Sequence, residues 1–182
     1  MIDLDNLLDD LHSEIKNHTG IPQLLLGEED IPENLLELPR GKMQFTIKYN
    51  PQARQSFIRK EEIIPSEEEG FEKDFEYTYI MHPSATLSIN FYGKDVTEYI
   101  SKAREWFMIN QYGRRFFESR KNSVIQEVTT TSNRKTFLET EYEDRQGFDV
   151  IIGFVDKVVV TEKTIEKVEF TINNSETYNV DV

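Results

Sequence analysis

The sequence predicts an α+β protein: an antiparallel or mixed β-sheet with helices on one face and an extended loop or hairpin arm. Two segments carry apolar residues at helical spacing, several alternate with a period of two, and one long polar stretch separates two expected strands. A length of 182 residues favours a single domain over 1–182. Within it we expect an N-terminal helix and connection (1–40), a core (41–172) with an arm at about 51–74, and a tail (173–182).

The first helix is expected over residues 3–17. Its apolar residues fall on one stripe: Leu4, Leu7, Leu8, Leu11 and Ile15. Asp3 precedes the stripe as an N-cap, and Gly20 followed by Pro22 ends the segment. Residues 20–40 contain apolar runs between prolines, which indicates an ordered connection to the core.

A second helix is expected over residues 95–109. Its apolar stripe consists of Val96, Tyr99, Ile100, Ala103 and Phe107. Glu98 and Lys102 have the i,i+4 spacing and order that favour an ion pair on a helix. The basic and aromatic segment 110–122 then predicts a connection with a short helical turn.

Alternating segments predict the strands. The clearest is 85–93, where apolar Ala85, Leu87, Ile89 and Phe91 alternate with Thr86, Ser88, Asn90 and Tyr92. In 43–50 the expected apolar face is Met43, Phe45, Ile47 and Tyr49. Further strands are expected at 75–81, 145–155 and 168–172, and at 123–131 and 135–143, which the turn residues "SNR" would join.

Residues 51–74 form a long polar excursion with "PSEEEG" at its tip. Ordering such a segment is costly, because each fixed backbone residue loses about 1–2 kcal/mol of conformational entropy. The excursion nevertheless contains Phe57, Ile58, Ile63, Ile64 and Phe71, which a solvated loop does not need. We therefore expect a hairpin arm that packs on an adjacent subunit or on the next layer of an assembly.

Charge is unevenly distributed along the chain. The formal net charge is -13, which disfavours general binding to nucleic acid. Residues 1–40 carry ten acids and two bases, 41–60 carry five bases and no acid, 61–76 carry eight acids and one base, and 100–121 carry six bases and two acids. Such blocks are typical of solvated faces, and they also suit a protein that contacts copies of itself.

No pattern in the chain indicates catalysis, a cofactor or a metal. The sequence has no Cys, which excludes disulfides, thiolate metal sites and a cysteine nucleophile. The three histidines, His12, His18 and His82, lack metal-ligand spacing. No glycine-rich phosphate loop or nucleophile elbow is present, and no apolar run reaches the roughly 20 residues that a membrane helix needs.

Arg145 and Asp149 stand in the apolar strand "RQGFDVIIGF". Four residues apart on one strand, they share a face about 13 Å apart, so each needs a partner from a neighbouring strand, a helix end or another subunit. A structural ion pair is one interpretation of Asp149, and a catalytic base or metal ligand is another. The basic segment Arg114, Arg115, Arg120 and Lys121 suits a subunit contact or stacking on nucleic acid.

One pattern resembles a known family. The segment "ATLSINFYGKDVTEYISKAREWF", followed by "YEDRQGFDVIIGF", is similar to the neck terminator or tail-completion proteins of tailed bacteriophages and prophages. The shared features are the aromatic–glycine strand end Tyr92–Gly93, the helix 95–109, and Arg145, Phe148, Asp149 and Val150 on a later strand. The resemblance covers about residues 75–155.

The resemblance implies a structural role without enzyme activity. Such proteins form a ring, typically a homohexamer, at the head-proximal end of the tail, where they stop growth of the tail tube and join it to the head–tail connector or adaptor. The expected partners are therefore other copies of the chain, the tail tube protein and the connector, with genomic DNA passing through the lumen without specific binding and no membrane. The expected location is the head–tail junction of the virion, after assembly in the host cytoplasm.

Under this hypothesis the candidate interface residues are Phe57, Ile58, Ile63, Ile64, Arg114, Arg115, Arg120, Lys121, Arg145 and Asp149. Catalytic, cofactor-binding and metal residues are expected to be absent. Other phage connector or tail-layer proteins remain an alternative, as do two different classes: a small α+β enzyme that uses Asp149 and His82, and a cytosolic binding adaptor.

Overall fold

A computed structural model describes residues 3–27, 37–50, 58–67, 71–94, 96–120, 122–134, 136–138, 141–163, 167–172 and 176–181. The chain forms two compact units. The first, here called the body, comprises Met1–Gln55 and His82–Asp156, and the second, called the arm, comprises Ser56–Met81 and Lys157–Val182. The expectation of one domain over the whole chain stays a prediction.

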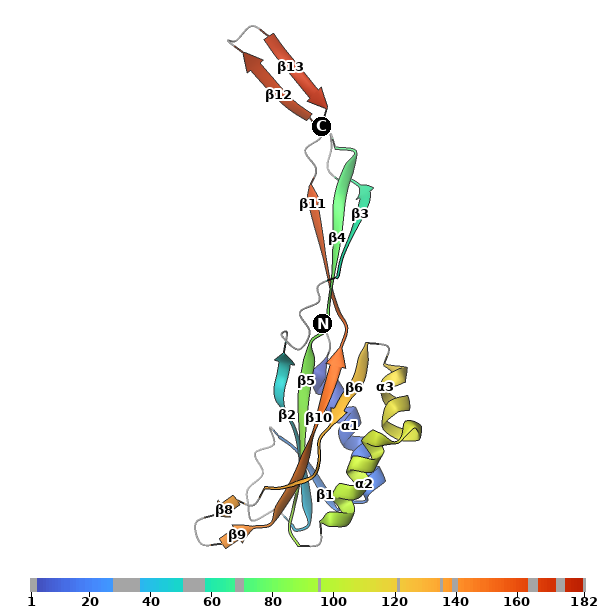
Figure 1. Ribbon diagram of the computed structural model, residues 1–182, viewed down its shortest axis with the longest axis vertical. Coiled ribbons are helices and arrows are strands. Elements are labelled where there is room, and N and C mark those ends of the chain that lie inside the picture. The colour runs from blue at the N-terminus through green and yellow to red at the C-terminus, as the bar shows by residue number, and fades with distance from the viewer. Residues whose placement is uncertain are drawn as a thin grey trace. The chain divides into compact units, whose positions relative to one another are not determined.

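The body is built on a mixed sheet with strand order β1-β2-β5-β10-β6, and β7 pairs with β10 beside β6 (Figure 1). Its strands are β1 Gln23–Leu26, β2 Arg40–Asn50, β5 Ser84–Tyr92, β6 Ser123–Val128, β7 Ser132–Asn133 and β10 Arg145–Phe154. β1 runs parallel to β2, and the other pairs are antiparallel. The helices α1 Leu4–Thr19, α2 Thr97–Met108 and α3 Arg115–Ser119 lie on one face of this sheet (Figure 1), so the predicted α+β class is confirmed.

Helix α1, Leu4–Thr19, begins and ends where its capping residues predict. The Asn6 backbone N–H donates to Asp3 Oδ1 at 3.0 Å, as expected of an N-cap. Gly20 adopts the left-handed conformation with φ 71° at the C-terminal end, and its N–H donates to the Lys16 carbonyl. The predicted stripe packs on the core: Leu7, Leu11 and Ile15 are buried, and Leu4 and Leu8 are partly buried.

Helix α2, Thr97–Met108, buries Ile100, Ala103, Trp106 and Phe107. Lys102 Nζ lies 2.7 Å from Glu98 Oε1, the ion pair that their spacing predicts. The following segment folds into a π-helical turn, η3 Asn110–Arg114, and the short helix α3 Arg115–Ser119. This confirms the expected helical turn in the basic connection.

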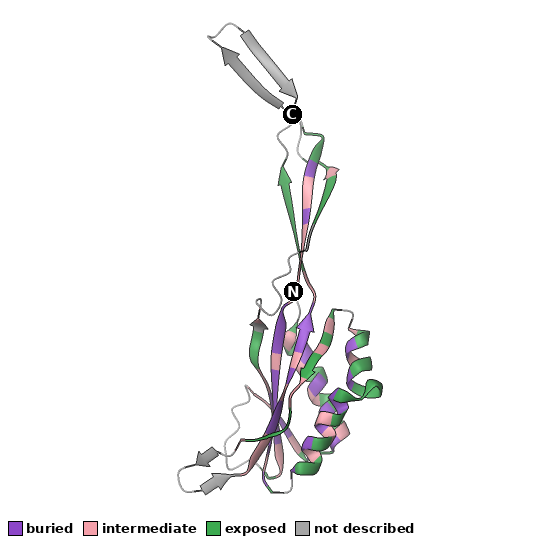
Figure 2. Cartoon of the chain, viewed as in Figure 1, coloured by how far each residue is buried: buried purple, intermediate pink, exposed green. Residues whose placement is uncertain are grey.

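The central strands β5 and β10 have two chemically different faces. On the helix-covered face, Ala85, Leu87, Ile89 and Phe91 of β5 meet Phe148, Val150 and Ile152 of β10, and all seven are 0% exposed. Figure 2 shows this burial along both strands. The opposite face, here called the open face, carries the polar residues of the same alternation. The candidate site lies on this open face.

One strand face departs from its prediction. Phe45 pairs with Leu87 on the helix-covered face, but the register shifts between Phe45 and Ile47, so that Ile47 pairs with Thr86. This irregularity turns Ile47 to the open face, where it is 46% exposed. The predicted continuous apolar face of 43–50 is therefore wrong beyond Phe45, and Tyr49 falls outside the residues whose side chains are described.

The expected strand at 135–143 is also wrong. The structure has two short strands there, β8 Thr136–Leu138 and β9 Glu141–Glu143, which pair with each other. β5 occupies one edge of β10, and β6 and β7 together occupy the other, so no edge of β10 remains for a further strand.

The arm contains a three-stranded sheet with the order β11-β4-β3, formed by β3 Ile58–Pro65, β4 Lys73–Met81 and β11 Asp156–Lys163. β3 and β4 form the expected hairpin, closed by a hydrogen bond from Ser66 N–H to the Glu72 carbonyl. The hairpin is longer than predicted, because the strand expected at 75–81 is its returning strand.

Two further strands of the arm, β12 Lys167–Ile172 and β13 Glu176–Asp181, form a separate antiparallel pair. The strand expected at 168–172 is confirmed as β12. Residues 176–181, expected to be a tail, instead form β13. The sequence analysis also missed β1, β11 and β7, the last of which lies in the "SNR" residues that were expected to form a turn.

Candidate functional site

The open face of the body sheet is polar but not fully hydrated. Ser88 and Asn90 of β5 point to this face, yet they are only 4% and 1% exposed. Buried polar groups in proteins need hydrogen-bond partners, because an unsatisfied group costs about 1–3 kcal/mol. The partners of these two side chains come largely from one arginine.

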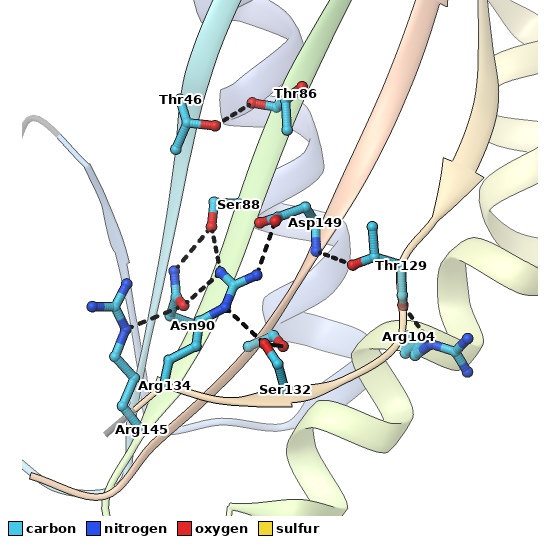
Figure 3. A network of polar contacts seen from close by, with 11 residues as sticks. Thr46, Thr86, Ser88, Asn90, Arg104, Thr129, Ser132, Arg134, Arg145 and Asp149 are labelled. Carbon is cyan, nitrogen blue, oxygen red and sulfur yellow. Dashed lines mark hydrogen bonds and ion pairs between the residues drawn. The ribbon is translucent and has the colours of Figure 1, made fainter. Parts of the chain in front are cut away.

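Arg134, which follows β7, lies over the open face and holds four acceptors (Figure 3). Its Nη1 donates to Ser88 Oγ at 2.9 Å and to Asn90 Oδ1 at 3.1 Å. Its Nε donates to Ser132 Oγ at 3.0 Å, and its Nη2 lies 2.9 Å from Asp149 Oδ2. Strands β5, β7 and β10 are thus joined through one guanidinium group.

Asp149 is tied to its neighbours by both side chain and backbone. Its carboxylate pairs with Arg134, and the two side chains are 32% and 25% exposed, respectively. Its backbone N–H donates to Thr129 Oγ1 at 2.8 Å, while Thr129 N–H donates to the Asp149 carbonyl at 2.9 Å. The geometry gives Asp149 a clear structural contact, and any catalytic use of its carboxylate would compete with this ion pair.

Arg145 lies at the level of Tyr92, which pairs with it in register. Its Nε donates to Asn90 Oδ1 at 3.2 Å, and its guanidinium carbon lies 5.4 Å from the centroid of the Tyr92 ring. On the other side of β5, Arg40 also pairs with Tyr92 and lies 4.9 Å from the same centroid. Two arginines therefore share one aromatic ring.

The basic segment predicted as an interface is only partly available for partners. Arg114 and Arg115 are exposed, and Arg114 Nη1 donates to Asn110 Oδ1 at 3.0 Å. Arg120 forms an ion pair with Asp10 of α1 in the same chain, and its guanidinium lies 3.9 Å from the centroid of the Phe116 ring. Lys121 lies outside the described residues.

The predicted interface residues of the arm differ in exposure. Ile63 is 65% exposed, whereas Ile64 is half-buried. Ile58 begins β3, but its side chain is outside the description, and Phe57 is outside it altogether. β11 adds Val158, Val159 and Val160, each at least 39% exposed, so the described part of the arm sheet presents substantial apolar surface.

Sequence reasoning missed the central role of Arg134. The alternation of 85–93 placed Ser88 and Asn90 on one face, but nothing in the pattern showed that this face was buried. A usable signal was Gly147 in the interior of a strand. It pairs with Asn90, and a Cβ at Gly147 would lie 2.3 Å from Asn90 Oδ1, so the glycine makes room for the network.

Among the described residues no group of three or more His, Asp or Glu side chains is placed to hold a metal ion. In the same residues no helix is long and apolar enough to cross a membrane.

Comparison with known proteins identifies the family. The family model described as "Phage neck terminator protein" matches residues 40–177, and no curated protein matches the chain. The matched range contains β5, β10, the polar network between them and both helices of the basic segment. The chain therefore belongs to the phage neck terminator proteins.

Proposed function

We propose that this chain is a structural virion protein that forms a ring, six-fold by expectation, at the head-proximal end of a phage tail. The ring ends growth of the tail tube and joins the tail to the head connector, and DNA passes through it. The observation that carries this proposal is the family match over residues 40–177. The proposal assigns the protein no catalytic role.

The arm supports a role in assembly. A three-stranded sheet without covering helices has little interior, and in this one Val159 and Ile63 are 55% and 65% exposed. Apolar surface of this kind is typical of protein contacts, because burying it contributes about 25 cal/mol per Å². We propose that Ile63 and Ile64, with β11, pack against a neighbouring subunit or the adjoining layer of the neck.

The exposed cations support contacts between unlike surfaces. Arg114 and Arg115 lie at the α3 end of the body, whereas the exposed face of α1 carries Asp5 and Asp9. A ring needs such a heterologous contact, in which one patch meets a different patch on the next copy. The described body offers opposite charges for it.

Two experiments test the proposal. Negative-stain micrographs and sedimentation velocity of the purified protein should show closed rings with a central hole. In phage produced without the protein, heads and tails should accumulate unjoined. A protein that stays monomeric at high concentration, together with normal head–tail joining in its absence, would refute the proposal.

Hydrogen exchange provides a test of the arm. Amide exchange of residues 58–67 should be fast in the isolated chain and at least tenfold slower in the assembled ring, because packing on a neighbour protects the hairpin. Equally fast exchange in both states would mean that the arm has no partner.

A further inference from the structure

The open face of the body sheet has an excess of positive charge near Tyr92. Arg40, Lys42 and Arg145 lie on this face by their register with β5, and Arg134 crosses it. Among the described carboxylates, Asp149 lies on this face and pairs with Arg134, and Asp144 precedes Arg145 at the strand end, where its carbonyl accepts from Gly93 N–H. Glu127 pairs with Ile151 at the level of Thr86, about 20 Å along the sheet from Tyr92. In a chain of net charge -13, this local excess is unusual.

Arg145 is held in place without a carboxylate partner among the described residues. Its Nε is bound to Asn90 Oδ1 and its plane lies near the Tyr92 ring, so both Nη groups remain available. Arg134 and Arg145 also donate to the same Asn90 oxygen, which brings two like charges together. A guanidinium fixed in this way is suited to bind a two-oxygen anion, because less side-chain entropy is lost on binding.

The β3–β4 hairpin of the arm has an excess of negative charge. Residues 60–81 contain eight acids and two lysines. Within the hairpin, Glu62 of β3 and Glu76 of β4 are directly opposite in register. Like charges in this position have Cβ atoms about 4.5–5.5 Å apart and destabilise the pair. Lys60 bonds to Glu62, and the charge of Glu76 attracts the same lysine at longer range.

We propose that Arg145, held beside the Tyr92 ring, binds the Glu62 and Glu76 carboxylates of a hairpin from a second copy of this chain. The contact rests on the proposed ring function, and it names where the arm of one subunit docks. It would relieve repulsion on both surfaces: between neighbouring guanidinium groups on the sheet and between paired carboxylates on the hairpin.

A second copy fits this site better than nucleic acid does. The hairpin presents two carboxylates that are directly opposite in register, and it is available at equal stoichiometry. DNA would have to approach an assembly whose every subunit carries a net charge of -13, and tight binding to DNA needs many phosphate contacts.

Charge reversal tests the proposal. Arg145→Glu alone and Glu62→Lys with Glu76→Lys should each weaken self-association at least tenfold in sedimentation velocity, about 1.4 kcal/mol. An equimolar mixture of the two variants should recover association to within about threefold of the wild type, because each copy then offers what the other lacks. On the exposed face of α2, Lys102→Glu matches the charge change of Arg145→Glu, and Glu98→Lys with Glu105→Lys matches that of the reversed hairpin. Both controls should leave association unchanged.

The outcomes separate the alternatives. If the wild type self-associates and the Arg145→Glu variant associates equally well, the docking site is overturned and the ring function stands. The Arg145→Glu variant could lose both association and DNA binding, with no recovery of association in the mixture. That result assigns Arg145 to nucleic acid. If association recovers only in a chain that carries Arg145→Glu, Glu62→Lys and Glu76→Lys together, the hairpin contacts the sheet of its own chain. If a variant with Arg114→Glu and Arg115→Glu restores association of the Glu62→Lys, Glu76→Lys variant, the hairpin docks on the basic segment instead. A wild-type chain that never self-associates overturns both proposals.

Discussion

Replacing Arg134 with Met tests whether the polar network stabilises the body. Methionine keeps much of the apolar stem and removes the guanidinium group with its bonds to Ser88, Asn90, Ser132 and Asp149. A net contribution of about 1.5–3 kcal/mol is typical of a hydrogen bond to a charged group. The Arg134–Asp149 pair is 25% and 32% exposed, so solvent screening reduces its share.

The remaining acceptors limit the loss further. After the change, Ser88 Oγ still accepts from Asn90 Nδ2 at 3.2 Å, and Asn90 Oδ1 still accepts from Arg145 Nε at 3.2 Å. The Asp149 carboxylate is left without its cation but is partly hydrated. We therefore expect Arg134→Met to lower the free energy of unfolding by about 2 kcal/mol, which corresponds to about 4–8 °C in Tm for a chain of this size.

Arg145→Met is the matched control, because it removes the same group from the same face. Arg145 makes one hydrogen bond in this network and one contact with Tyr92, so we expect a loss of about 1 kcal/mol or less. Urea unfolding followed by tryptophan fluorescence measures both variants. The single tryptophan, Trp106, is 2% exposed in the core of the body and reports unfolding of that unit. A loss for Arg134→Met no larger than that for Arg145→Met would refute the reasoning.

Three further predictions concern the body. Gly147→Ala should destabilise it by about 1–3 kcal/mol in urea unfolding, because the new Cβ would lie 2.3 Å from Asn90 Oδ1; an unchanged midpoint would contradict the close packing. Leu11→Ala, at a site with 0% exposure, should cost about 2–5 kcal/mol by the same assay. The pKa of Glu98 is lowered by its hydrogen bond to Lys102, so the stabilisation from this pair is present above the ordinary pKa of glutamate and lost as the pH falls through the lowered value. Because the pair is exposed, Glu98→Gln should leave Tm at pH 7 unchanged within error.

The sequence predicted elements well where local pattern and tertiary environment agree. β5 and β10 alternate cleanly, and each buries the apolar face that the alternation predicts. Helix α1 has a complete apolar stripe between Asp3 and Gly20, so both its face and its ends were predictable. In these segments burial follows directly from the period of the side chains.

The sequence analysis was wrong where long-range pairing decides the structure. The register shift after Phe45 depends on how β2 pairs with β5, which no local pattern reveals. β8 and β9 pair with each other because both edges of β10 are occupied. The candidate site was predicted only in part, because Arg134 reaches its acceptors from 44 to 46 residues away in the sequence on β5.

The two units of the chain present different kinds of surface to a partner. On the open face of the body, Ser88 and Asn90 have hydrogen-bond partners within the chain, so this face is stable without a cover and offers mainly charge. The arm instead exposes Ile63 and Val159, whose burial would contribute apolar free energy to a complex. Charge pairs chiefly determine orientation and partner choice, whereas apolar burial contributes most of the affinity. In the proposed ring, an arm that carries both exposed valines and a carboxylate pair would bind a neighbour tightly and still select one orientation, as closure of a ring requires.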